Sequence, residues 1–355
     1  MKRSSRLAGI LLLQALIALS AVSAAAAANP GPAKVGPKYL WNFATIVPKG
    51  MGWVQQYEKL VAPTLDQISN QELKLKIHWG GSQGKDEDVI KKIRAGKLQG
   101  AGLDARGTVM AVKELSVLEL PFLFNGYEEV DYVRGKMHTT FDKYAEKSGF
   151  CLGLWIDQDF DQLYSSKYDF SDPKHFAQAR FANWCGDLEK RVLENVGGPG
   201  STVPADINTF ISMISKGTAD SAVAPALWVV GTQLFSVFTS VNPVKIRYSP
   251  GSVLIGKKAW DELPDEYRKR FMEKRTGLET TINQAVRLDN RKALAAMVRY
   301  GVKLASVSDA NVATLKEKTR KIYGEMADSA YPRQLLEEVS AKLAEFRRQK
   351  PGKAA

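Results

Sequence analysis

Residues 73–103 read LKLKIHWGGSQGKDEDVIKKIRAGKLQGAGL, and this stretch decides the fold class. Its first seven residues alternate strictly between apolar and polar side chains, which is typical of a strand with one buried face. A glycine-rich turn follows, then a segment that we interpret as a helix, and then a second short strand. Strand–helix–strand order of this kind predicts an α/β protein.

The segments on either side continue this alternation. We predict a buried strand at 39–47, an amphipathic helix at 52–69 and another buried strand at 149–156. From residue 261 the chain is nearly all helical to about residue 346, and the sequence LPDE marks a helix start there. A chain of 355 residues is long enough for two lobes with buried cores, so we expect a two-lobe α/β architecture with a helical C-terminal part.

The first 28 residues have the three-part pattern of a secretory signal peptide. A basic segment, MKRSSR, is followed by an uncharged apolar run, LAGILLLQALIALSAVS, and then by small residues and a turn former, AAAAANP. We predict cleavage near residues 24–28 and export of the mature chain. A retained anchor is the alternative, since the run has a marginal length for a membrane span.

The formal net charge of +12 falls to +9 when the three basic residues of the signal peptide, Lys2, Arg3 and Arg6, are removed. The remaining basic residues are scattered among acids, and no zinc or recognition motif accompanies them. We therefore expect a solvated basic surface and no nucleic-acid binding. Attraction to anionic partners at a membrane surface remains open.

Side chains that carry enzyme or metal chemistry show no recognisable arrangement. His78, His138 and His175 lack metal-ligand spacing, and no nucleophile elbow or dinucleotide fingerprint is present. After export Cys151 and Cys185 either pair or stay free thiols, and the sequence leaves both open. We predict a protein without catalytic residues, metal or cofactor, for which binding is the default function.

The stretch WIDQDFDQLY carries three aspartates at alternate positions, Asp157, Asp159 and Asp161. On a regular strand their carboxylates point to one face. The spacing begins like a calcium loop, but Gln162 and Tyr168 occupy the positions of its glycine and glutamate, which excludes that site. An enzyme in which these aspartates act as acid and base is a rival interpretation.

Four segments together resemble the substrate-binding proteins of tripartite ATP-independent periplasmic (TRAP) transporters, the dicarboxylate-binding-protein-like family. They are FATIVPKGMGWVQQYEKLV (43–61), KIHWGGSQGKDEDVIKKIRAGKLQGAGLD (76–104), ELSVLELPFLF (114–124) and KKAWDELPDEYRKRF (257–271). The resemblance extends over roughly residues 39–330, and it rests on the order and spacing of the segments.

The resemblance implies a two-lobe periplasmic binding protein fold, in which hinge strands join two α/β lobes and a long C-terminal helix braces both. The ligand would lie in the cleft, and the lobes would close on it. The implied boundaries are lobe I at 38–158 plus about 247–280, lobe II at 159–246, C-terminal helices across both lobes at 281–347, and a basic tail at 348–355.

The resemblance also implies a role in the periplasm. The protein would deliver a small-molecule ligand to TRAP membrane permease subunits that are driven by an ion gradient, without ATP and without a cofactor. Its contact with the membrane would be through the permease alone.

Members of this family usually hold an organic acid through an arginine, because a guanidinium offers two parallel donors to a carboxylate. In the family that arginine ends a Lys-Ile-Arg tripeptide, which falls on residues 180–182 of this chain, so the matching position is Ala182. A second cationic position of the family, on the preceding strand, matches Asp161. Relative to the family, this cleft lacks two cationic side chains and has one additional carboxylate. We expect such a cleft to repel organic acids. We therefore expect a neutral, largely apolar ligand.

Other ligand contacts are expected in the loop after the first strand and on the apolar walls of the cleft: Thr45, Trp53, Trp184, Val223 and Trp228. Three alternatives stay open. An amine would suit Asp161 beside an aromatic wall. An organic acid would need Arg106 or Arg180 to reach inward. A sensor or scaffold subunit would need no ligand.

Overall fold

One sheet of nine strands organises the residues that the computed structural model describes, 36–50 and 54–349. The predicted signal peptide, Trp53 and most of the basic tail lie outside the described residues. The strands run in the order β2-β1-β3-β8-β4-β7-β5-β6, and β9 pairs with β8. Their bounds are β1 (Tyr39–Ala44), β2 (Leu73–His78), β3 (Gly100–Leu103), β4 (Phe150–Ser165), β5 (Phe181–Asn183), β6 (Thr202–Pro204), β7 (Ser221–Ala224), β8 (Ser240–Gly256) and β9 (Lys303–Leu304).

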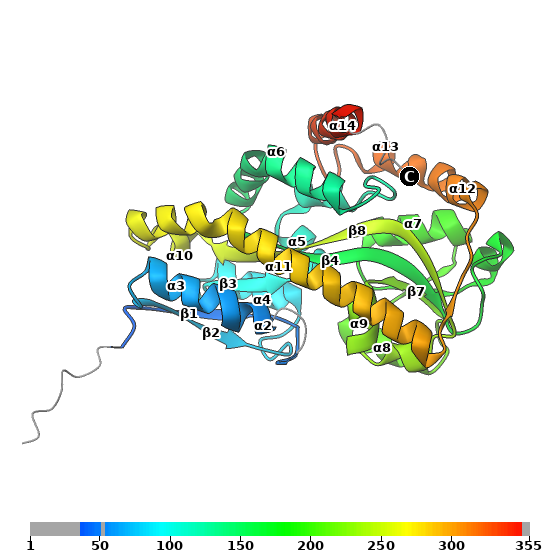
Figure 1. The fold of residues 1–355 in the computed structure, drawn as a ribbon, viewed down its shortest axis with the longest axis horizontal. Helices are drawn as coiled ribbons and strands as arrows, with labels where there is room; N and C mark the ends of the chain where they lie inside the picture. Colours follow the sequence, from blue (N-terminus) through cyan, green and yellow to red (C-terminus); the bar gives the residue numbers. More distant parts are fainter. Residues whose placement is uncertain (1–35, 51–53, 350–355) are drawn as a thin grey trace, which may run out of the picture. The chain divides into compact units, whose positions relative to one another are not determined.

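Helices surround this sheet (Figure 1). Those before β5 are α2 (Val54–Gln56), η1 (Tyr57–Val61), α3 (Ala62–Ile68), α4 (Asp86–Arg94), α5 (Ala105–Ala111), η2 (Lys113–Glu119), α6 (Tyr127–Lys147) and η3 (Pro173–Gln178). Those after β5 are α7 (Asp187–Gly197), α8 (Ile207–Ser215), α9 (Ala226–Gly231), η4 (Leu234–Ser236), α10 (Lys257–Asp261), α11 (Asp265–Tyr300), α12 (Asp309–Arg320), α13 (Ile322–Met326) and α14 (Arg333–Gln349). None of the helices in the described ranges is long and apolar enough to cross a membrane.

Two long strands, β4 and β8, occupy the middle of the sheet and pair antiparallel over most of their length. The parallel strands β1 and β2, with β3, lie on one side of this pair, and β7 with the parallel β5 and β6 lies on the other. We call the part built on β1–β3 lobe I and the part built on β5–β7 lobe II. The predicted lobe boundaries near 158 and 247 fall inside β4 and β8, and they stay predictions.

The stretch at 73–103 folds as its pattern predicts, into β2, α4 and β3. Helix α4 has acidic residues in its first turn and basic residues in its last, which suits the helix dipole, and it buries Val89, Ile90 and Ile93. The helix predicted at 52–69 is less regular. A π-helical turn, η1, separates α2 from α3 and ends two residues before Pro63. A proline donates no N–H, and a wide turn accommodates that loss.

The predicted long C-terminal helix is confirmed as α11, whose 36 residues span about 54 Å. It starts after Pro264 with two acidic residues in its first turn and ends at Gly301, whose φ of 121° suits glycine. It contacts α3 in lobe I, α9 in lobe II and the central strand β4 (Figure 1). Its asparagines bond the strand backbone, since Asn283 accepts from Asp157 N and Asn290 donates to Gln158 O. One helix therefore braces both lobes and the strand that joins them.

Candidate functional site

A pocket that encloses about 540 Å³, part of it open to solvent, has walls from both lobes and from the two central strands. We call it the cleft pocket. Its lining includes Ile46, Val47, Leu103 and Asp104 from lobe I, Trp184, Cys185, Pro225 and Trp228 from lobe II, and Gln158, Asp161, Arg247 and Ser249 from the central strands.

The sheet topology explains this position. Val47 follows β1, Asp104 follows β3, Trp184 follows β5 and Pro225 follows β7. The carboxyl ends of the strands in both lobes therefore meet at the pocket, which is where open α/β sheets bind their ligands.

Among the described residues that line the cleft pocket, the one cationic side chain is that of Arg247, on β8. It is 3% exposed, and it reaches Asp161 on the neighbouring strand through Nε (2.8 Å) and Nη2 (2.5 Å). Its Nη2 also donates to Glu189 Oε2 at 3.2 Å, and its Nη1 lies 3.6 Å from Glu119 Oε2. Ser249 donates to the second oxygen of Asp161 at 2.8 Å. One guanidinium is thus shared among three buried carboxyl groups.

The pKa values of the surrounding acids reflect this excess of carboxyl groups. Burial raises the pKa of Glu119 to about 8, although Arg247 opposes the shift. Burial also raises the pKa of Glu189 and of Asp104, again against the effect of nearby arginines. The acidic side chains around the cleft pocket therefore outnumber the one arginine that could neutralise them. The raised pKa values mean that protonation neutralises part of this excess negative charge.

The expectation that the three aspartates share one face is wrong. Asp157 pairs with Pro250 but Asp159 pairs with Ser249, so Gln158 is an extra residue that forms a bulge in β4. Asp159 has a φ of 129°, and this conformation is uncommon for a residue with a side chain. Because of the bulge, the side chains of Asp157 and Asp161 lie on opposite faces of β4.

Partners on β8 confirm the reversal. Asp157 accepts from Tyr248, whereas Asp161 accepts from the adjacent residues Arg247 and Ser249, which lie on the opposite face of that strand. A glycine makes the bulge possible, because a Cβ on Gly251 would lie 2.6 Å from the carbonyl oxygen of Ile156.

Asp157 and Asp159 belong to the protein interior away from the cleft pocket. Asp157 accepts from Arg134 at 2.8 Å and from Arg287 at 2.6 Å. Asp159 accepts from the hydroxyl of Tyr127, and burial raises its pKa to about 6. Neither aspartate lines the cleft pocket.

Three of the sequence-predicted contacts, Asp161, Trp184 and Trp228, come together in the cleft pocket. The two indole rings stack with centroids 5.2 Å apart and planes 10° from parallel. Thr45 is buried next to the lining residues Ile46 and Val47.

The other predicted contacts lie outside this lining. Ala182 and Val223 are fully buried in the core of lobe II, and the carbonyl of Val223 accepts from the indole of Trp184. Arg106 pairs with Glu87 at 2.7 Å, and Arg180 is exposed. Neither arginine lines the pocket, so neither is placed to hold a ligand there.

Sequence reasoning missed Arg247, Asp104 and Glu189. A signal for Arg247 was present, because Lys245-Ile246-Arg247 repeats the tripeptide in which the family arginine is expected, although on a different strand. Asp104 follows a short strand and precedes a helix, a position that usually indicates a helix cap, and it does accept from Gly107 N at 2.8 Å.

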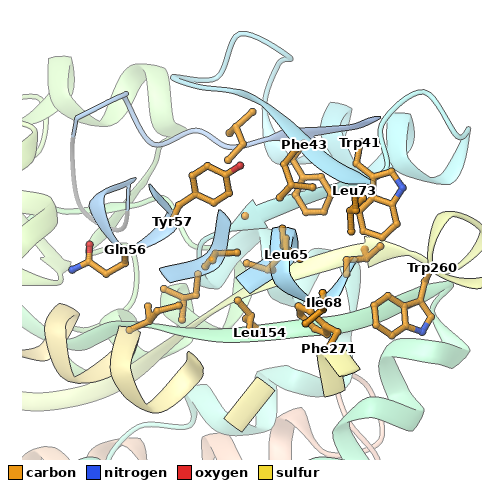
Figure 2. A pocket seen from close by; sticks show the side chains of 18 of the residues that line it. Trp41, Phe43, Gln56, Tyr57, Leu65, Ile68, Leu73, Leu154, Trp260 and Phe271 are labelled. Carbon is orange, nitrogen blue, oxygen red and sulfur yellow. The ribbon is translucent and has the colours of Figure 1, made fainter. Parts of the chain in front are cut away.

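A second pocket, of about 800 Å³, lies inside lobe I and has walls that are almost entirely hydrocarbon. Figure 2 shows Trp41 and Phe43 of β1, Leu73 of β2, and Leu65 and Ile68 of α3 around it. Several of these side chains belong to the hydrophobic core of the lobe. The described sequence-predicted contacts are absent from its walls, so we take the cleft pocket as the candidate site.

The two cysteines are free thiols. Cys185 lines the cleft pocket, where burial raises the pKa of its thiol well above the ordinary value. Within the described ranges, no group of three or more His, Cys, Asp or Glu side chains is arranged to hold a metal ion.

Comparison with known proteins agrees with this architecture. The family model for bacterial extracellular solute-binding proteins, family 7 (DctP), matches residues 43–330. The C4-dicarboxylate-binding periplasmic protein DctP of Rhodobacter capsulatus is 21% identical over 330 residues, which cover 89% of this chain and 94% of that protein.

Solved structures show the same fold at low identity. The sugar acid binding protein DctPAm from Advenella mimigardefordensis, in complex with galactonate, has a TM-score of 0.79 and 17% identity, over 88% of this chain and 99% of that one. A TRAP periplasmic solute binding protein from Desulfovibrio salexigens, with bound orotic acid, has a TM-score of 0.80 and 17% identity, over 87% and 100%. The fold and the family match over most of the chain show that this protein belongs to the bacterial extracellular solute-binding proteins of family 7.

Proposed function

We propose that this protein is an exported, periplasmic solute-binding protein that captures a small organic molecule in the cleft pocket and delivers it to a TRAP permease. The observation that carries the proposal is the composition of the pocket walls. Lobe I contributes aliphatic side chains and lobe II contributes the stacked pair Trp184 and Trp228. A ligand held between them would favour closure of the lobes, and closure is the signal that a permease can read.

We further propose that the ligand is neutral and largely apolar. The guanidinium of Arg247 already faces Asp161, Glu189 and Glu119. A ligand carboxylate would add another negative charge, and two like charges 4 Å apart repel by about 4 kcal/mol at an effective dielectric constant near 20. An uncharged, largely apolar ligand would instead pack favourably against the aliphatic and indole side chains of the pocket.

Binding of an organic acid is the second candidate. It is favoured by one atom, since Nη1 of Arg247 lacks a hydrogen-bond partner among the described residues. It is also favoured by the relatives, because the two solved structures above contain galactonate and orotic acid. In this case Arg247, and neither Arg106 nor Arg180, would hold the carboxylate.

Delivery to a permease and periplasmic location rest on the family membership and on the signal-peptide pattern of residues 1–28. Transport predicts that uptake of the ligand into vesicles carrying the permease requires this protein and an ion gradient, and does not require ATP. Uptake that proceeds equally without the protein would contradict the proposal.

Native mass spectrometry of protein isolated from its own host tests the site. We expect a bound small molecule in the wild type and its loss in Trp228→Ala. Trp260→Ala is the matched control, because Trp260 is also a half-buried tryptophan but lines the lobe I pocket. Loss of the ligand in Trp260→Ala with retention in Trp228→Ala would move the site into lobe I. The proposed function would be wrong if the wild-type protein carried no ligand and bound none from a metabolite panel.

A further inference from the structure

Three buried polar atoms on the wall of the cleft pocket have no hydrogen-bond partner among the described residues. They are Nη1 of Arg247, Nε1 of Trp228 and Oδ2 of Asp104. Two are donors and one is an acceptor. Buried polar groups are nearly always hydrogen-bonded, so an unmatched set among the residues that line a pocket indicates the polar pattern of what binds there.

We propose that the ligand is a neutral amide-type molecule, such as a carboxamide, a lactam or a cyclic imide, whose carbonyl oxygen accepts from Arg247 or Trp228 and whose N–H donates to Asp104. This inference rests on the proposed function and names the ligand class of the same site. The aliphatic and indole walls hold the hydrocarbon part of the molecule.

The hydrogen bonds of Arg247 within the protein disfavour a ligand carboxylate. Arg247 uses Nε and Nη2 on Asp161 and Glu189, so the hydrogen-bond donor that remains for a ligand is Nη1, which lies 3.6 Å from Glu119 Oε2 without a hydrogen bond. A bidentate clamp needs two parallel donors from one guanidinium, and here they are already occupied by Asp161. A single N–H from Arg247 and one from the Trp228 indole suit a carbonyl oxygen, which accepts through two lone pairs.

The acceptor that the lining offers is Oδ2 of Asp104. Its Oδ1 caps the following helix by accepting from Gly107 N, and this fixes the carboxylate while Oδ2 remains unmatched. The neighbouring buried acid, Asp86, has its pKa raised to about 8 by burial and by the charge of Asp104. Asp86 therefore holds a proton at neutral pH.

A free amine would meet Asp104 favourably but would leave both donors unmatched. It would also bring a positive charge toward Arg247. An amide offers an acceptor to the donors and an N–H to Asp104 without adding charge. The amide class is thus the one that matches donors, acceptor and charge together.

Binding of matched probes by isothermal titration calorimetry tests the inference. The probes are nicotinamide, nicotinate and 3-(aminomethyl)pyridine, which share a ring, and isovaleramide with isovalerate, which share an aliphatic body. We expect at least one amide to bind about tenfold or more tightly than its matched acid and amine. An acid or amine that binds as tightly as its amide would overturn the inference and leave the proposed function intact.

Variants then locate the contacts. Asp104→Asn keeps the cap through its remaining oxygen but turns the unmatched acceptor into a donor, so we expect at least a tenfold loss of amide affinity. Asp86→Asn is the control, because it removes the adjacent buried acid without changing the pocket wall, and it should retain amide binding. Trp228→Phe should weaken binding more than Trp184→Phe, since the Trp184 indole donates to Val223 O within the protein.

Equal affinities in Asp104→Asn and Asp86→Asn would overturn the assignment of Asp104. Absence of binding by all five probes would overturn the amide class, while the molecule that copurifies from the host would still decide the proposed function. The two hypotheses can therefore fail separately.

Discussion

Two buried aspartates on the same strand, Asp157 and Asp161, have opposite electrostatic surroundings. Asp157 lies between two arginines, Arg134 and Arg287, and also accepts from Tyr248. Although burial by itself raises the pKa of Asp157, the two arginines bring it below its ordinary value. Asp161 instead shares a single arginine with two other acids.

This difference separates a structural network from a binding site. Around Asp157 the carboxylate is saturated by strong, short contacts that join α6, α11 and the two central strands. Around Arg247 acids are in excess, and polar atoms of the pocket lining have no hydrogen-bond partner in the described part of the chain. The first arrangement stabilises one conformation, and the second can be completed by a ligand.

The largest effect is expected when the saturated network is broken. Among the described residues, Asp157→Asn leaves buried Arg134 with one acidic partner, the half-exposed Asp131, besides the hydroxyl of Tyr248, and we expect the unfolding free energy to fall by about 3–5 kcal/mol. Urea denaturation measures this loss. Asp131→Asn is the control, because Asp131 contacts Arg134 and Arg287 from a side chain that is 48% exposed, and it should cost less than about 1 kcal/mol. Similar losses in both variants would contradict the distinction.

The acid-rich region predicts a pH dependence. The folded-state pKa of Glu119 is about 8, above its ordinary 4.5, so the folded protein binds this proton more tightly than the unfolded chain. Its stabilising contribution is complete below about pH 4.5 and is lost as pH rises toward 8, at about 1.4 kcal/mol per pH unit.

Glu119→Gln should remove this slope from the unfolding free energy measured between pH 5 and 7. Glu129→Gln is a matched control, because hydrogen bonds from Arg347 and Asn125 outweigh burial and lower the pKa of Glu129, which therefore stays ionised across this range. An unchanged slope in Glu119→Gln would show that the acids around Arg247 are not in excess.

Local elements of the fold were predictable from sequence because their signals are local. The alternation at 73–78, the helix dipole pattern of α4 and the LPDE start of α11 each depend on residues a few positions apart. The family match shows in addition that the order of the four family-like segments predicted the correct fold.

The site was less predictable because its contacts are long-range. Asp161 and Arg247 are 86 positions apart, and their pairing depends on the register of β4 against β8. The extra residue Gln158 places Asp157 and Asp161 on opposite faces of the strand, and no local sequence pattern predicts this bulge. Position matching to the family found Asp161 but could not supply its partner from a different strand.

A smaller effect, on specificity, should follow from changing Asp161 itself. Asp161→Asn retains an acceptor for Arg247 but removes one negative charge from the pocket. We expect the affinity for nicotinate relative to nicotinamide to rise about tenfold, or about 1.4 kcal/mol. Asp159→Asn is the control on the same strand, because Asp159 contacts Tyr127 and does not line the pocket. A shift of equal size in both variants would argue against a local charge effect.

The smallest effect concerns an ion pair between the lobes, in which Lys85 of lobe I pairs with Asp206 of lobe II. This ion pair favours the closed arrangement, but Lys85 is 41% exposed, so solvent and salt screen it. We expect Lys85→Ala to weaken ligand binding only about two- to threefold, with the difference vanishing above about 0.5 M salt. Lys74→Ala is the matched control, because Lys74 is equally exposed but pairs with Asp66 inside lobe I. A salt-independent loss beyond tenfold would mean that Lys85 contributes to the ligand site itself, and the unmatched atoms around Arg247 would then describe only part of it.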